Sequence, residues 1–107
     1  MENLIDEKIL SHDEMKLLTG VEIQEYLLQL KEGWELSDNK IKKLFQFENF
    51  DKSMEFVNKV SDIAKKDNHH PDILIYFKKV EIVLSSHHVN GLSINDFIIA
   101  TKIDLID

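Results

Sequence analysis

The 107-residue chain contains no cysteine, only one proline and only three glycines. Without thiols it can form neither a disulfide bond nor a thiolate metal site. No apolar run approaches the roughly 20 residues that a membrane-spanning helix needs. The first residues also lack the basic and apolar regions of a secretory signal peptide. We therefore expect a soluble, cytoplasmic protein without a membrane partner.

Basic charge is scarce as well. The 13 Lys and Arg residues are outnumbered by 20 Asp and Glu residues, which gives a formal net charge of −7. Proteins that bind the phosphates of nucleic acids need clustered Lys and Arg. We therefore expect no nucleic-acid partner. The length and the 43% hydrophobic content fit a single globular domain with one core.

The first half of the chain has the pattern of one helix and two strands. Thr19 begins a capping box, apolar residues then recur at helical spacing, and Gly33 is a suitable stop, which predicts a helix over residues 20–32. Residues 34–36 are expected to be extended. Residues 40–48 alternate between apolar and polar side chains, and the two segments together predict a hairpin.

A second helix follows. Asp51 is the expected N-cap, and an apolar stripe continues to a predicted end near Asp67. Residues 73–77 and 79–85 then predict a tight antiparallel hairpin, with the Phe77 ring in the core.

Ser93 opens a second capping box and a last helix, in which Asp96 is the expected capping carboxylate. The order of elements is helix, two strands, helix, two strands, helix. It predicts an α+β fold, a four-stranded antiparallel sheet with three helices packed on one face. Because such a sheet leaves two edges and one face uncovered, we expect a homodimer or homotetramer.

Four of the five histidines lie between residues 69 and 88. Pro71 favours an extended backbone at His70, so the pair His69-His70 should leave the second helix. Antiparallel pairing of the last two strands should bring His87, at the end of the fourth strand, beside that pair. His88 should point the other way.

Three interpretations of this convergence stay open from the residues alone. The histidines could be polar loop residues with local hydrogen bonds. They could bind zinc or iron, although the chain has no His-x-His or His-x3-His spacing, and adjacent histidines are poor co-ligands. They could also form a metal-free pocket in which one imidazole donates a proton and another accepts one.

The motif His69-His70-Pro71, followed by Phe77, His87 and Asp96, resembles the signature of the pterin-4a-carbinolamine dehydratase family. Leu18-Thr19-x-x-Glu22, Gly33-Trp34, the Phe-rich strand and Gly91-Leu92-Ser93 are also similar to that family. The resemblance covers residues 18–104. We therefore interpret residues 18–107 as a single domain and residues 1–17 as an N-terminal extension, in which Ser11 and Glu14 could cap a short turn.

The resemblance implies dehydration of 4a-hydroxytetrahydrobiopterin to the quinonoid dihydropterin plus water. This reaction recycles the pterin of aromatic amino acid hydroxylases, which would be pathway partners, and needs no metal or redox cofactor. By the same resemblance His69 and His87 are the acid–base residues, and His70 assists or orients the pterin. Five further residues are candidates for binding or supporting roles: Lys65, Pro71, Asp72, Ser86 and Asp96.

Two points of this interpretation have alternatives. Lys65 stands where the family often has a carboxylate, which leaves open which histidine is the acid and which the base. Asp96 is either only a helix cap or also a partner of His87. Members of the family in animals also act as dimerisation cofactors of a homeodomain transcription factor, so a non-catalytic, protein-binding role is the alternative function. The complete histidine set favours the enzyme.

Overall fold

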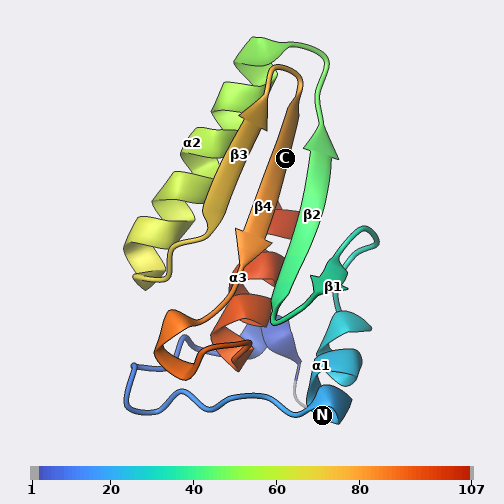
Figure 1. Ribbon diagram of the computed structural model, residues 1–107. Coiled ribbons are helices and arrows are strands. Elements are labelled where there is room, and N and C mark those ends of the chain that lie inside the picture. The colour runs from blue at the N-terminus through green and yellow to red at the C-terminus, as the bar shows by residue number, and fades with distance from the viewer. Residues whose placement is uncertain (1–2, 107) are drawn as a thin grey trace.

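The computed structural model describes residues 3–106, and it confirms the predicted α+β class (Figure 1). A short N-terminal segment precedes the order of elements that the sequence predicts. The elements are η1 (Leu4–Asp6), α1 (Gly20–Leu27), β1 (Glu35–Ser37), β2 (Lys40–Gln46), α2 (Phe50–Asp67), β3 (Asp72–Tyr76), β4 (Lys79–Leu84), η2 (His87–Val89) and α3 (Ile94–Asp104).

The four strands form one antiparallel sheet in the order β1-β2-β4-β3. The central pairing sets Ile41 opposite Leu84 and Phe45 opposite Val80, so apolar side chains of β2 and β4 share one face. Ile41, Val80 and Leu84 are completely buried there. Helices α2 and α3 lie behind that face in Figure 1, which leaves β1 and β3 as the sheet edges.

Helix α3 is the most deeply enclosed element. Phe97, Ile99 and Ala100 have no exposed surface, although they point in different directions around the helix. A helix that is apolar all round must be covered all round. Helix α2 and η1 pack against it, and its buried side chains share one core cluster with those of β2 and β4.

The segment that precedes α1, expected only as an extension, is attached to α3 at several points. Leu4 is 2% exposed within the core, and Met15 is also buried. The Asn95 side chain of α3 accepts a hydrogen bond from the Leu10 amide at 2.8 Å and donates one to the Leu10 carbonyl at 2.9 Å. The segment therefore packs against the core and is part of the domain's folded structure.

The turn suggested by Ser11 and Glu14 is present in this segment. The Ser11 amide and hydroxyl donate to the Glu14 carboxylate at 3.1 and 2.9 Å. The hydrogen bond from the Ser11 backbone amide lowers the pKa of Glu14 most, and the hydrogen bond from the Ser11 hydroxyl lowers it further. The turn thus favours an ionised carboxylate at this position.

Two helix boundaries differ from the sequence prediction. Helix α1 ends at Leu27 rather than near residue 32, because Gln29 and Leu30 bond to carbonyls only three residues back and tighten the chain into turns. The N-cap of α2 is Asn49, whose side chain accepts from the Lys52 amide at 2.8 Å, and not Asp51. The capping boxes at Thr19 and Ser93 are confirmed.

The prediction that Phe77 lies in the core is wrong. Phe77 and Lys78 form a two-residue turn between the paired residues Tyr76 and Lys79. Phe77 adopts φ +57°, the left-handed conformation that such tight turns require, and its side chain is 65% exposed. Two strand ends also differ from the predicted ranges: β2 ends at Gln46 rather than at residue 48, and β3 begins at Asp72 rather than at residue 73.

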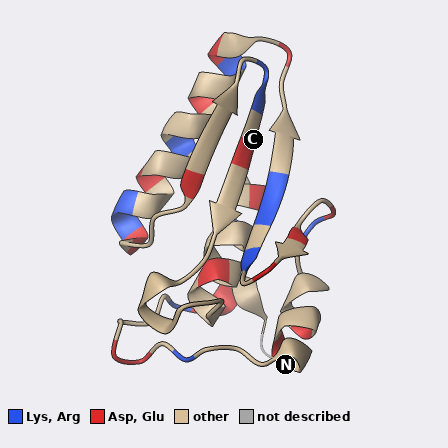
Figure 2. Ribbon diagram, in the orientation of Figure 1, with Lys and Arg blue, Asp and Glu red and all other residues tan. Residues whose placement is uncertain are grey.

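The charges of the described residues are mixed rather than separated by sign. Figure 2 shows basic and acidic residues alternating along α2, and both signs on the sheet. Across residues 3–106 no helix combines the length and apolarity that crossing a bilayer would take.

Replacing Leu4 tests whether the N-terminal segment is part of the cooperative core. Leu4→Ala should lower the free energy of unfolding by about 2–5 kcal/mol, the usual range for a buried leucine. Ile5→Ala in the same turn is the matched control, because Ile5 is 59% exposed. Urea unfolding of both variants measures the difference, and equal midpoints would contradict the packing described here.

Candidate active site

The end of α2 delivers His69 to the interior. Asn68 caps the helix in the left-handed conformation, with φ +50°, and the amides of Asn68 and His69 both donate to the Ala64 carbonyl. This reversal turns the chain from the helix axis toward β3. His69 is consequently only 8% exposed, whereas His70 is exposed.

A tight loop after β4 carries the other two histidines. Strand β4 ends at Leu84, and Ser86 and Gly91 form an isolated bridge, in which the Ser86 amide donates to the Gly91 carbonyl at 2.7 Å. The prediction that His87 ends the fourth strand is therefore wrong, because His87 begins the 3-10 turn η2. A Cβ at Gly91 would lie 2.5 Å from Cδ1 of the exposed Leu17 side chain, so glycine lets that side chain lie close against the loop.

His69, His70, His87 and His88 line one cavity of about 170 Å³. The antiparallel pairing of β3 with β4 brings the two pairs together across the sequence, as the topology predicted. The prediction that His88 points away is wrong, because strand alternation has already ended at Leu84 and the 3-10 turn directs both side chains to the same cavity.

Asp96 is the buried centre of the site. Its side chain has no exposed surface, and its Oδ1 lies 2.7 Å from His69 Nε2. Its Oδ2 accepts from the Ser86 hydroxyl at 2.8 Å and from the Ser93 amide at 3.0 Å. Asp96 is thus both the helix cap and the partner of a catalytic candidate. That partner is His69 rather than His87, which was the alternative left open by the sequence.

The hydrogen bonds of Asp96 assign the tautomer of His69. An ionised carboxylate only accepts hydrogen bonds, so His69 Nε2 is the donor. The Nδ1 atom is then the nitrogen that can take up or release a proton. A carboxylate in this position also stabilises the imidazolium that forms when Nδ1 takes a proton. The geometry suits proton transfer by His69.

The other residues proposed from the sequence are only partly brought to the cavity. Ser86 lines it, whereas Lys65, Pro71 and Asp72 are not among its lining residues. Lys65 is exposed in the last turn of α2, and Asp72 is exposed at the start of β3, opposite Val83.

Four lining residues were not anticipated from the sequence: His12, Met15, Asn68 and Ser85. The His12 ring stacks on the His88 ring, with centroids 5.0 Å apart and an interplanar angle of 22°. His12 lies in a polar segment without periodicity, so its residue type was the only signal that could have marked it.

The same geometry bears on the metal-binding interpretation. Among residues 3–106 no three His, Asp or Glu side chains are placed so that they could hold one ion. The Nε2 atom of His69 is engaged by Asp96. This nitrogen is therefore already occupied by a hydrogen bond.

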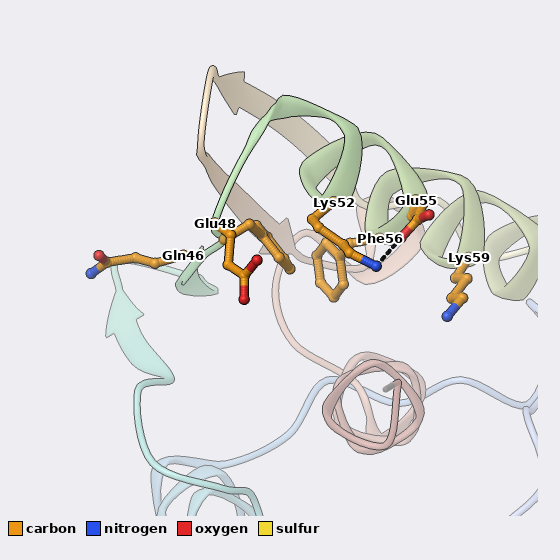
Figure 3. Close-up of a pocket in the computed structure, with 7 residues that line it drawn as sticks. Gln46, Glu48, Lys52, Glu55, Phe56 and Lys59 are labelled. Atoms are coloured by element: carbon orange, nitrogen blue, oxygen red, sulfur yellow. Dashed lines mark ion pairs between the residues drawn. The ribbon is translucent and has the colours of Figure 1, made fainter.

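A larger cavity of about 570 Å³ lies at the opposite end of α2 (Figure 3). Phe47 and Phe56 line it together with charged side chains, of which Lys52 and Glu55 form an ion pair at 3.3 Å. No histidine lines this cavity. The candidate histidines lie at the smaller cavity instead.

Comparison with known proteins identifies the family of this chain. The family model described as pterin 4 alpha carbinolamine dehydratase matches residues 16–106. A protein of Sulfurisphaera tokodaii, provisionally named pterin-4-alpha-carbinolamine dehydratase, is 46% identical over 84% of this chain and 96% of its own length. A protein of Nitrosomonas eutropha with the same provisional name is 39% identical over 79% of this chain and 75% of its own length.

Solved structures give the same result. The crystal structure of a transcriptional coactivator/pterin dehydratase from Brucella melitensis has a TM-score of 0.78 and 30% identity, and the match covers 82% of this chain and 95% of that chain. A pterin dehydratase-like protein identified as a RuBisCO assembly factor shares the fold, with a TM-score of 0.59 and 17% identity over 68% of this chain and 87% of that chain. The chain belongs to the pterin 4 alpha carbinolamine dehydratase family.

Proposed function

We propose that the protein dehydrates 4a-hydroxytetrahydrobiopterin to quinonoid dihydropterin and water, a step of tetrahydrobiopterin recycling. The observation that carries this proposal is the buried contact of 2.7 Å between His69 Nε2 and Asp96. This contact lies at a cavity that His70, His87 and His88 also line. The membership of the family supplies the reaction class.

The elimination needs two proton transfers and no change of oxidation state. An imidazolium donates a proton to the C4a hydroxyl oxygen while the C–O bond breaks, because hydroxide is a poor leaving group. A neutral imidazole accepts the proton lost from a ring nitrogen. One proton enters the departing water and one leaves the pterin, so the balance closes. General acid–base catalysis of this kind typically contributes 10²–10⁴-fold.

The environments of the histidines favour one division of these roles. His69 is the base, because Asp96 stabilises the imidazolium that forms on it. His87 is the acid, because its exposed position on η2 lets it regain a proton from water. His70 orients the pterin from the segment that Pro71 holds extended.

Asp96→Asn tests the role of the carboxylate. The amide oxygen can still accept from Ser93 and Ser86, but the amide nitrogen would donate to His69 and enforce the wrong tautomer. We expect kcat to fall by about 10²-fold or more with little change in thermal melting. Stopped-flow assay of freshly generated 4a-hydroxytetrahydropterin measures kcat.

Asp96→Ala is the companion variant. It removes both carboxylate oxygens and should lower the free energy of unfolding by about 1–3 kcal/mol for each buried donor left unsatisfied. Wild-type kcat in Asp96→Asn would refute the assigned role, whatever the stability of the alanine variant.

The double variant His69→Gln/His87→Gln tests the acid–base pair. Dehydratase activity should be abolished, whereas the melting temperature should stay close to that of the wild type, because glutamine can still donate to Asp96. Turnover that survives in the folded double variant would reject the mechanism. An inactive wild-type protein would instead favour the non-catalytic, protein-binding alternative.

We also propose that the protein forms a homo-oligomer, a dimer or a tetramer, through the edge strand β3. This edge is longer than that of β1 and presents Ile75 and Tyr76, which are 42% and 52% exposed. An unpaired apolar edge readily pairs with a second copy.

Light scattering after size-exclusion chromatography tests this association. The wild type should have a multiple of the 12.5 kDa chain mass. Ile75→Lys/Tyr76→Lys should shift it toward the monomer, because charges at the edge oppose pairing. Leu36→Lys on β1, where Leu36 is 43% exposed, should keep the wild-type mass. A monomeric wild type would contradict the proposal.

A further inference from the structure

The N-terminal segment forms one side of the histidine cavity. The family model begins at residue 16, yet His12 and Met15 line this cavity. His12 is exposed, and its ring stacks on His88 of the η2 turn. The wall of the cavity is thus built partly from residues outside the part of the chain that the family model matches.

This wall is held in place from both sides. Leu10 is bonded through its amide and carbonyl to the buried Asn95 side chain. Met15 is 8% exposed, and its sulfur lies 3.5 Å from the Ser93 hydroxyl. His12 lies between these two attachments. Because the segment is already ordered, binding a ligand against it would not require the entropy of ordering a loop.

Another cavity, of about 440 Å³, adjoins the histidine cavity and is called the second cavity below. The two cavities share His12, Asn68 and His69 as lining residues. Its other walls are largely polar and come from the N-terminal segment, from Asp67 at the end of α2 and from Asn95 of α3. This polar space therefore lies beside any ring bound in the histidine cavity, and a substituent of that ring can extend into it.

The charges of the second cavity limit the kind of substituent. Glu14 lines it, and the hydrogen bonds from Ser11 favour its ionised form. The Asp67 carboxylate is paired with Lys102 and also lines the cavity. Carboxylates accept hydrogen bonds from hydroxyl groups and repel anions. Because Lys102 offsets the charge of Asp67, the repulsion comes mainly from Glu14, and it favours a neutral, hydroxylated substituent over a phosphorylated or carboxylated one.

We propose that the cavity formed by the N-terminal segment is a subsite for the neutral hydroxylated substituent of the pterin ring, and that His12 is the positioning residue at its boundary. The inference rests on the proposed function, which supplies the pterin ring. His12 acts through the position of its ring against His88, not by exchanging a proton with the substrate.

Steady-state kinetics with two substrates test the subsite. One is 4a-hydroxytetrahydrobiopterin, which carries a dihydroxypropyl group, and the other is its 6-methyl analogue, which carries none. His12→Ala should raise KM for the first substrate by about 3- to 10-fold, the equivalent of one hydrogen bond or ring contact. The rise for the 6-methyl substrate should be smaller, and the loss should fall on KM rather than on kcat.

Two variants serve as controls. His12→Phe keeps an aromatic ring against His88 and should restore the wild-type KM. Asp13→Ala, at an exposed neighbour that lines neither cavity, should behave as the wild type. Equal KM changes for both substrates in His12→Ala, or no rescue by His12→Phe, would overturn the subsite.

Equilibrium binding separates this inference from the proposed function. Fluorescence titration with 7,8-dihydrobiopterin and with 6-methyl-7,8-dihydropterin needs no turnover. Weaker binding of the first probe alone in His12→Ala supports the subsite even if the wild type turns over neither substrate, an outcome that would reject only the dehydratase activity. Active wild type with unchanged binding of both probes in His12→Ala would reject only the subsite.

Discussion

The buried carboxylate of Asp96 is the interaction on which the site depends. It joins three parts of the chain, because it accepts from Ser93 at the start of α3, from Ser86 after β4 and from His69 after α2. A carboxylate without exposed surface is tolerated only when its oxygens are hydrogen-bonded. The same bonds that satisfy it therefore hold the segments that carry the histidines in a fixed relation.

The connections around this carboxylate bend sharply at residues suited to bend. Asn68 and Asn90 both adopt the left-handed conformation, at φ +50° and +53°, which asparagine tolerates better than most residues. The first turns the chain out of α2 and the second closes the loop that carries His87. A short loop with few accessible conformations keeps the His87 side chain in place without a large entropic loss on binding.

The N-terminal segment links stability with the shape of the site. Leu4 fills a place in the core beside α3, and Leu10 is fixed to Asn95, which adjoins Asp96 in the same helix. His12 follows Leu10 and precedes the buried Met15, and these two attachments hold it at the histidine cavity. The part of the chain that the family model leaves out thus packs against the most enclosed helix of the domain.

Much of the fold was determined by local patterns that can be recognised in the sequence. Capping residues at Thr19 and Ser93 set helix starts, and the alternation in β2 and β4 set the buried face of the sheet. The approach of His87 to His69 also followed from the sequence, since antiparallel pairing fixes which strand ends are neighbours.

Only the tertiary structure decided the partner of Asp96, the outward position of Phe77 and the arrival of His12. These depend on how far a loop carries a side chain, on the handedness of a tight turn and on how an aperiodic segment packs. Local propensity does not encode such distances, because they arise when elements remote in sequence compete for the same buried space. The sequence by itself therefore determined which elements form and which chemistry is available, and packing decided which side chains meet.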